Sequence, residues 1–266
     1  MGRYKNTYNF DEFTDENQKK EVQRLHAQAT LASDLEKEAL EYLKIPENSN
    51  IVDIGCGPGF VTAQIAENNP TCSVSGLDTS EELLAVANDF TYKYQENLNF
   101  KLADAYNTKF ANDSVDFIYN RLIYQHIEHP VDALTEAKRI LKPRGRICIL
   151  DIDDQMQIFY PELPSFPKLQ KIAGENQQEY GGDRLIGRKL PSLLKEAGYK
   201  NIRCLIRGVT TLDIGFEAFF NIVVSFKAQI VGEKGDQLVE QIRKEVQELN
   251  QEPFGIISVL VVTGEA

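Results

Sequence analysis

The most informative pattern in the chain is a short apolar run that leads into three glycines. Residues 51–54 are mostly apolar, and Gly55, Gly57 and Gly59 follow at alternate positions before a helical apolar pattern begins at Phe60. Because glycine lacks a Cβ, its backbone can turn sharply and leave peptide groups open to a ligand. The pattern predicts a buried strand, a ligand-binding turn and a helix.

Similar apolar runs recur along the chain and alternate with segments of helical periodicity. This alternation indicates an α/β protein with an open, doubly wound sheet, and such sheets bind ligands at the carboxyl ends of their strands. The predicted strands after the first one are residues 74–78, 98–102, 115–119, 147–150, 201–206 and 255–263. The clearest helical segments are residues 133–141, 185–197, 216–231 and 235–249.

The spacing of the glycines excludes two common nucleotide-binding loops. A dinucleotide-binding loop has its third glycine three residues after the second, where this chain has Phe60. A triphosphate-binding loop needs a Gly-Lys-Ser/Thr ending, but this chain has no lysine between Lys44 and Lys93. The turn instead fits another cofactor that contains adenosine.

These residues resemble the class I S-adenosylmethionine-dependent methyltransferases. The glycine loop at residues 52–59 is followed by Asp78 after the second strand, by Asp104 after the third strand, and by a Lys-Pro-x-Gly turn at residues 142–145. Their order and spacing indicate more than a chance match. The resemblance implies a Rossmann-like doubly wound sheet of seven strands, mostly parallel with the last strand antiparallel, plus helical cap insertions.

The resemblance also implies a cofactor, S-adenosyl-L-methionine, with S-adenosyl-L-homocysteine as its product. Asp78 stands about 20 residues after the loop, where a carboxylate can accept both ribose hydroxyls. Asp104 matches the acid that contacts the adenine amino group in the family. The expected cofactor-binding residues are Asp53, Gly55, Cys56, Gly57, Gly59, Asp78, Thr79, Asp104, Ala105, Asn120 and Arg121.

The segments around this core are expected to cover the site. The N-terminal arm contains Tyr4, Tyr8, Phe10 and Phe13, and it either folds over the site or packs on the surface or on a second subunit. A helical stripe between residues 14 and 43 predicts one or two helices. In similar methyltransferases such helices cover the cofactor edge and could bring side chains to the pocket. For three polar residues of this stripe the surface is nevertheless the expected place: Arg24, His26 and Gln28.

We expect one methyltransferase domain that spans residues 1–266. A polar segment with three prolines follows the fifth predicted strand, and we interpret it as a cap over the substrate. The predicted parts are the arm and leading helices (1–45), the cofactor-binding core (46–151), the substrate cap (152–190) and the remaining sheet with inserted helices (191–266).

Methyl transfer from a sulfonium mainly requires that the acceptor be aligned with the S–CH₃ bond and that water be excluded. A hydroxyl acceptor also needs a base. His126 is the candidate, because it follows the fourth predicted strand and imidazole titrates near neutral pH. The alternative for His126 is a scaffold role, in which the ring hydrogen-bonds to the backbone.

Four further residues are candidates for substrate contact. Asp151 and Asp153 form a cluster with Asp154 after the fifth strand, where carboxylates could hold a cationic substrate or share a proton. Tyr124 and Tyr180 could line an aromatic pocket. Solvated acids and packed or exposed tyrosines are the alternatives. No metal is expected, because no histidine accompanies these acids.

Charge and composition restrict the classes of partner that this chain is expected to bind. The chain has 40 acidic and 29 basic residues, a net charge of −11, which repels a polyphosphate backbone, and it lacks a long basic run. Nucleic acid is therefore an unlikely partner. No apolar run approaches the roughly 20 residues that span a bilayer, and the start of the chain carries no apolar signal segment. We expect a cytoplasmic monomer or homodimer with a small-molecule substrate and no membrane partner.

The predicted function is transfer of a methyl group to an oxygen or nitrogen of a small molecule by in-line displacement. One alternative is a protein or RNA methyltransferase, which a contiguous basic groove beside the pocket would favour. The other is a non-catalytic S-adenosylmethionine-binding regulator, which a blocked substrate side would favour.

Overall fold

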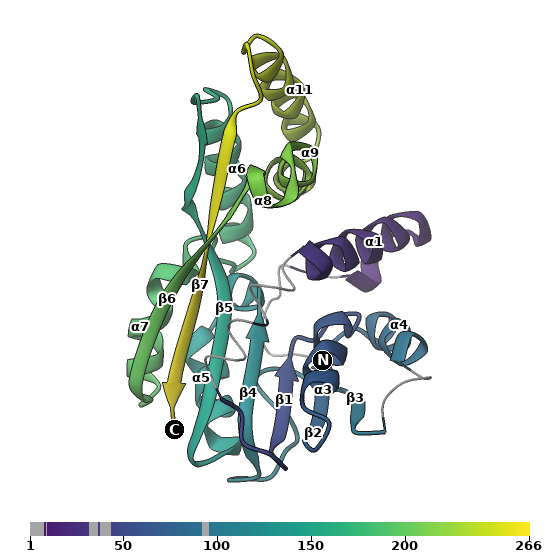
Figure 1. Cartoon of the computed structure of the whole chain (residues 1–266), viewed down its shortest axis with the longest axis vertical. Coiled ribbons are helices and arrows are strands. Elements are labelled where there is room, and N and C mark those ends of the chain that lie inside the picture. Colours follow the sequence, from purple (N-terminus) through teal and green to yellow (C-terminus); the bar gives the residue numbers. More distant parts are fainter. Residues whose placement is uncertain (1–7, 9, 32–36, 38–43, 92–95) are drawn as a thin grey trace.

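A computed structural model describes residues 8, 10–31, 37, 44–91 and 96–266, and in this part of the chain seven strands form one sheet in the order β3-β2-β1-β4-β5-β7-β6 (Figure 1). Strands β1 to β5 run parallel, whereas β7 lies antiparallel between β5 and β6. This confirms the predicted fold class. The strands are β1 (Asn50–Ile54), β2 (Ser73–Asp78), β3 (Leu98–Leu102), β4 (Val115–Arg121), β5 (Leu141–Tyr160), β6 (Lys200–Thr210) and β7 (Phe254–Glu265).

Helices cover both faces of the sheet because the central strands are apolar on both faces. In β1, Val52 and Ile54 belong to a core on one side, which includes residues of α5 and α7. Ile51 belongs to the core on the other side, with residues of α3, as alternation along a strand requires. The helices are α1 (Asp15–Leu31), α3 (Phe60–Asn68), α4 (Glu81–Thr91), α5 (Pro130–Ile140), α6 (Phe166–Glu179), α7 (Ile186–Glu196), α8 (Thr211–Ile214), α9 (Phe216–Phe220), α10 (Phe226–Val231) and α11 (Glu233–Gln247).

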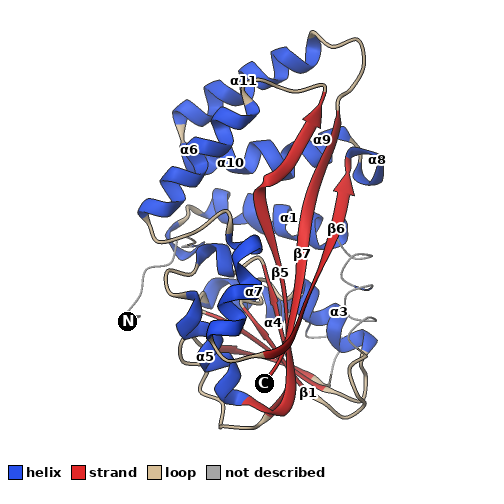
Figure 2. Ribbon diagram, turned by 90° about the vertical axis from the view of Figure 1, so that its left-hand side faces the viewer, coloured by secondary structure: helices blue, strands red, loops and turns tan. Residues whose placement is uncertain are grey.

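Strands β5, β6 and β7 extend well beyond the rest of the sheet (Figures 1 and 2). Their far ends carry α6 and α8 to α11, and we call this part the upper lobe. It has a core of its own, in which Phe159 of β5 packs with Phe219 and Phe220 around a π-helical turn, η3 (Asn221–Ser225). Helix α1 lies between the upper lobe and the cofactor half of the sheet (Figure 1).

The fifth strand is much longer than its apolar run predicted. The run at residues 147–150 marks only its centre. We expected residues 152–160 to begin the substrate cap, but they continue β5 and pair with β7 as far as Tyr160. Polar residues remain in the strand because partners from elsewhere bind them: Arg188 donates to Asp153 at 2.7 Å, and Arg184 donates to Asp154 at 2.9 Å. The apolar run therefore predicted a strand that is too short.

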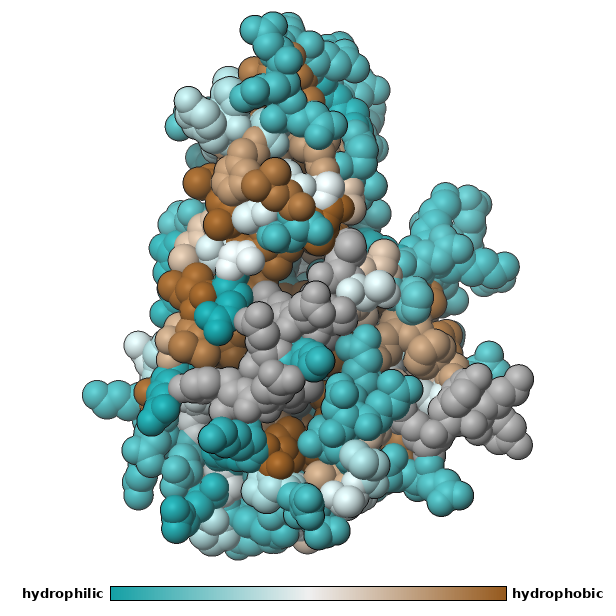
Figure 3. Space-filling model, in the orientation of Figure 1, coloured by the Kyte–Doolittle hydropathy of each residue, from teal (hydrophilic) through white to brown (hydrophobic). Residues whose placement is uncertain are grey.

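The surface of the upper lobe has two characters. In the space-filling view the tip around α11 is hydrophilic, and apolar side chains gather below it over β6 and β7 (Figure 3). Exposed large apolar residues here include Ile206 and Leu212.

The expectation of a monomer or homodimer stays a prediction. Within the described ranges, none of the helices combines the length and apolar character needed to cross a bilayer.

Candidate active site

The turn between β1 and α3 has the left-handed backbone that its glycines allow. Gly55 and Gly57 have φ angles of 78° and 53°, a region that costs a residue with a Cβ about 1 kcal/mol. The N–H groups of Gly55 and Cys56 donate to the carbonyl of Leu77 at 2.7 and 2.9 Å. The loop is thereby fastened to the end of β2.

The carboxylate of Asp78 faces this loop from the end of β2. Its Oδ2 accepts the N–H of Gly57 at 2.8 Å and its Oδ1 accepts the N–H of Ser80 at 3.0 Å. Burial raises the pKa of Asp78, and these backbone donors oppose the rise. Each carboxylate oxygen keeps a further lone pair, so Asp78 is held in place while still able to accept ribose hydroxyls.

A cavity of about 580 Å³ opens in front of the loop, at the carboxyl ends of the strands. Nothing lies within 4 Å of the place that a Cβ on Gly57 would take, so bare peptide faces open space. Bare peptide, an acid for the ribose and a second acid after β3 together fit S-adenosylmethionine. The predicted cofactor residues that line this cavity are Asp53, Gly55, Cys56, Gly57, Asp78, Thr79, Asp104, Ala105 and Arg121.

Two predicted cofactor residues stand behind the cavity wall instead. Gly59 precedes α3, and a Cβ there would lie 2.6 Å from the Phe100 ring. Asn120 is buried and donates through Nδ2 to the carbonyl of Ile54 at 3.1 Å. Their contact with the cofactor stays a prediction, whereas their support of the loop is direct.

His126 lies in the short 3₁₀ turn η2 (Tyr124–His126) and lines the cavity. Its ring centroid is 5.6 Å from that of Tyr8. Burial, together with the guanidinium groups of Arg184 and Arg24, lowers the pKa of His126 to about 3. The imidazole is therefore neutral at physiological pH.

The four residues predicted to contact substrate are absent from the described cavity lining. Tyr124 is buried, and the buried carboxylate of Asp151 accepts the N–H of Ile152 at 2.9 Å. Asp153 is bound to Arg188, and Tyr180 is 63% exposed. Their role as substrate contacts stays a prediction that the cavity does not support.

The N-terminal arm folds over the cavity in the part that the structure describes. Tyr8 and Phe10 both line it, and the Tyr8 hydroxyl donates to Glu21 of α1 at 2.7 Å. Asp11 accepts a hydrogen bond from the Ser80 hydroxyl, just after β2. Tyr4, the first aromatic residue of the arm, lies outside the described residues. The arm thus closes one side of the cofactor site.

Two polar residues of α1 contradict the expectation that they lie on the surface. Arg24 and Gln28 line the cavity, whereas the ring of His26 packs 4.7 Å from that of Phe60. The Arg24 guanidinium lies 4.5 Å from the centroid of the Phe226 ring in α10. This cation–π contact holds the side chain toward the cavity. A partner so distant in sequence gives no local signal.

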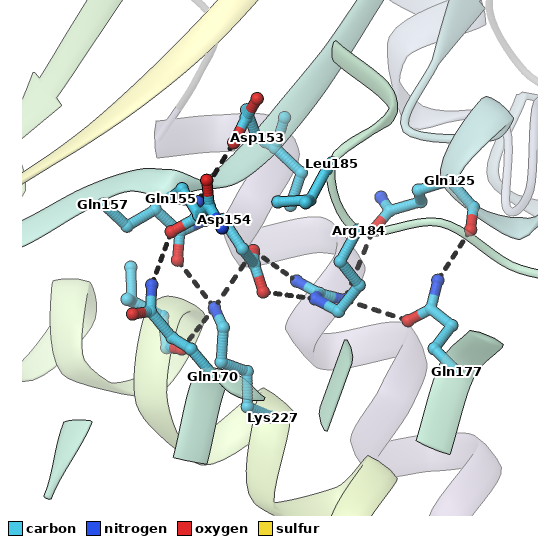
Figure 4. A network of polar contacts seen from close by, with 12 residues as sticks. Gln125, Asp153, Asp154, Gln155, Gln157, Gln170, Gln177, Arg184, Leu185 and Lys227 are labelled. Carbon is cyan, nitrogen blue, oxygen red and sulfur yellow. Dashed lines mark hydrogen bonds and ion pairs between the residues drawn. The ribbon is translucent and has the colours of Figure 1, made fainter. Parts of the chain in front are cut away.

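Sequence reasoning also missed two buried cations, one from the loop between α6 and α7 and one from α10 of the upper lobe. Arg184 and Lys227 are 3% and 1% exposed and both line the cavity. They meet at Asp154, which Arg184 holds through two nitrogens and Lys227 approaches to 3.4 Å (Figure 4). A lysine between apolar residues of a predicted helix was the available signal, since a buried lysine requires a partner.

The fold and this site define a class I, Rossmann-like methyltransferase. Residues 45–198 match a family described as a methyltransferase domain, more than half of the chain, and the chain therefore belongs to that family. This confirms the class inferred from the glycine loop and the two acids, the S-adenosylmethionine-dependent methyltransferases.

Two curated relatives align with about half of this chain. The chain is 32% identical over 130 residues to an uncharacterized methyltransferase of Schizosaccharomyces pombe, an alignment that covers 46% of each chain. It is 28% identical over 131 residues to a ubiquinone/menaquinone biosynthesis C-methyltransferase of Geotalea daltonii, covering 48% of this chain and 56% of that one. The chain thus spans about half the length of these curated relatives.

A solved structure shares the fold over almost the whole chain. Phosphoethanolamine N-methyltransferase 2 of Haemonchus contortus, in complex with S-adenosyl-L-methionine, superposes with a TM-score of 0.60 at 19% sequence identity. The match covers 96% of this chain and 60% of that one. At this identity the likeness concerns the fold.

Proposed function

We propose that this protein transfers a methyl group from S-adenosylmethionine to an oxygen or nitrogen of a small molecule by in-line displacement. The observation that supports this is the continuity of the cavity. Phe226 and Ile257 of the upper lobe line the same cavity as Gly57 and Asp78 of the cofactor site. Its volume of about 580 Å³ lies in the usual range for small-molecule sites.

S-adenosylmethionine, when bound, supplies an activated methyl group. The tasks left to the chain are to align the acceptor and to exclude water. Tyr8 and Phe10 of the arm line the cavity, together with Leu25 of α1. A site covered by the arm, α1 and the upper lobe favours a small acceptor over a macromolecule.

The surroundings of His126 favour its scaffold role over the role of base. An efficient general base has a pKa near the working pH, whereas burial and two guanidinium groups lower the pKa of His126 to about 3. A neutral imidazole in the cavity wall can hold a backbone group or the acceptor by a hydrogen bond without accepting its proton.

A carbon acceptor is the second candidate. The Geotalea daltonii relative is named as a C-methyltransferase, and the apolar side chains of the upper lobe that line the cavity, among them Phe226 and Ile257, suit a hydrocarbon framework as well as a polar acceptor.

The test is incubation with methyl-labelled S-adenosylmethionine and a metabolite extract. The proposal predicts label in a low-mass product and, at a cofactor concentration that does not saturate the variant, much less transfer by Asp78→Ala. Analysis of the product by mass spectrometry and NMR identifies the acceptor atom. Label found only on RNA or protein would contradict the proposal, and cofactor binding without any transfer would favour the regulator.

A further inference from the structure

The cavity continues past the cofactor loop into a chamber within the upper lobe. Apolar side chains from two strands and three helical segments line it, and all of these elements lie far from the cofactor loop in the sequence. The apolar residues that line the chamber are Val209, Ile214, Ile222, Phe226, Ile257 and Val259. Such a wall suits the hydrocarbon body of a ligand.

Three cationic side chains line the same chamber, and two of them lie over the Phe226 ring. The guanidinium carbons of Arg24 and Arg184 lie 4.5 and 5.7 Å from the centroid of this ring. Lys227 follows Phe226 in the chain and is 1% exposed, and its Nζ approaches Asp154 of β5 to 3.4 Å. All three cations belong to the cavity lining.

The counter-ions of these cations stand behind the wall. Glu21 binds Arg24 at 2.6 Å, and Asp154 is shared by Arg184 and Lys227. Neither carboxylate is part of the described cavity lining. Two acids therefore balance three cations in this group, and the chamber faces the positive side of each pair. In a low-dielectric wall such an excess attracts an anion and repels an ammonium group.

Gln157 is the side chain that an entering anion would replace. Its Oε1 accepts from the Lys227 Nζ at 2.6 Å, and a second proton of the same nitrogen goes to the Val223 carbonyl at 3.0 Å. Gln157 and Lys227 both line the cavity. A charged oxygen is a stronger acceptor for an ammonium group than an amide oxygen, so an entering carboxylate could take the place of Gln157 at Lys227 while the bond to the Val223 carbonyl stays in place.

We propose that the chamber binds a small organic anion with an apolar body, whose oxyanion replaces the amide of Gln157 at Lys227 while the apolar body lies along the wall around Phe226. The inference rests on the proposed function, since it names the chemical class of the acceptor molecule. It also separates acceptors within that function: an organic acid fits this wall and a protonated amine does not.

The experiment compares four probes of equal chain length in the presence of saturating S-adenosylhomocysteine. Octanoate, octanamide, octanol and octylamine are titrated into the full chain in an isothermal calorimeter. We expect octanoate to bind at least tenfold more tightly than octanamide or octanol, and octylamine to bind most weakly. Equal affinities of octanoate and octylamine would overturn the proposal.

Three variants test which side chains cause the preference for octanoate. Lys227→Met keeps the length of the side chain and should abolish the tenfold preference for octanoate while leaving the affinity for octanol within twofold. Gln157→Glu places a third carboxylate beside the three cations, next to the Lys227 Nζ, and it should abolish the preference for octanoate. Lys171→Met, which removes an exposed lysine of α6, is the matched control and should change nothing.

Thermal unfolding of each variant, with and without S-adenosylhomocysteine, establishes that it is folded. If Lys227→Met does not fold, Gln157→Glu alone decides, and an unchanged preference in that variant contradicts the proposal. Failure of this binding test can be told apart from failure of the labelling experiment. Transfer of label to a neutral or cationic small molecule would leave the proposed function standing and refute the anionic class.

Discussion

The N–H of Gly57 lies 2.8 Å from the carboxylate Oδ2 of Asp78. This hydrogen bond joins the two sequence features that predicted the cofactor site, the glycine loop after β1 and the acid at the end of β2. A hydrogen bond to a charged group contributes about 1.5–3 kcal/mol, and here it orients the carboxylate as well as the loop. A change at either residue should therefore disturb the function of the other.

Asp78→Ala should weaken the binding of S-adenosylhomocysteine by about 100-fold, because it removes the acceptor for the ribose hydroxyls and leaves the N–H of Gly57 without its partner. Asp89→Ala, which removes an exposed acid from α4, should leave the affinity unchanged. Isothermal titration calorimetry checks both variants. Equal affinity of the two would show that the carboxylate at the end of β2 does not bind the cofactor.

Gly55→Ala should cost more stability than Gly57→Ala. Both residues have positive φ, so both variants carry a backbone strain of about 1 kcal/mol. At Gly55 the new Cβ would also lie 2.2 Å from Cγ2 of Ile123, whereas at Gly57 it meets nothing within 4 Å. Urea unfolding should give Gly55→Ala an additional loss of about 1–3 kcal/mol.

The same pair of variants separates packing from binding. The methyl group of Gly57→Ala points into open space at the cavity wall, so this variant should fold well and still bind S-adenosylhomocysteine at least tenfold more weakly. A Gly57→Ala protein with unchanged cofactor affinity would place the cofactor elsewhere.

Activity should not titrate with His126 between pH 5 and 8. Because the pKa of His126 is lowered to about 3 by burial and by Arg184 and Arg24, the ring keeps one protonation state across this range. The pH profile of kcat, measured for the wild type and for His126→Gln with the acceptor found by labelling, checks this. A wild-type inflection near the ordinary histidine pKa of about 6.5 that disappears in the variant would restore the role of base.

Asp151 should make the folded state less stable as the pH rises. Burial raises the pKa of Asp151 to about 7, whereas the unfolded chain has the ordinary value of about 3.9. The folded state thus holds a proton that the unfolded state has lost, and the free energy of unfolding falls by about 1.4 kcal/mol per pH unit between these two values. The contribution is fully present below the unfolded pKa and is lost as the pH approaches 7.

Urea unfolding of the wild type and of Asp151→Asn at pH 5 and pH 7 tests this. The asparagine cannot ionise, so the advantage of the wild type over the variant at pH 5 should shrink by about 2 kcal/mol at pH 7. A difference between the two proteins that is the same at both pH values would mean that Asp151 is ionised in the folded state throughout.

The cofactor half of the site could be predicted from the sequence because its signals are local. Gly55 and Gly57 reveal a turn that needs positive φ, and Asp78 lies at the end of its own apolar strand. Parallel strands bring their carboxyl ends to one edge, so the turn and the acid had to meet. Asp151 and Asp153 are absent from the described cavity lining because β5 continues past them to Tyr160, so they lie inside a strand and not at its end.

The chamber was beyond prediction because its members come from separate elements. Gln157 and Lys227 stand 70 residues apart, and they meet only because β5 runs past its apolar centre and pairs with β7 along the upper lobe. Arg24 is drawn inward by the Phe226 ring, a contact that helical periodicity in α1 does not encode.

The sequence by itself determined the order of strands and helices, the cofactor loop and the acids that face it, since glycine conformation and apolar runs act over a few residues. Only the tertiary structure decided which charges are buried together and which of them face the cavity. The physical reason is that a buried charge is tolerated only beside its counter-ion, and that partner is chosen by packing in space rather than by position in the chain.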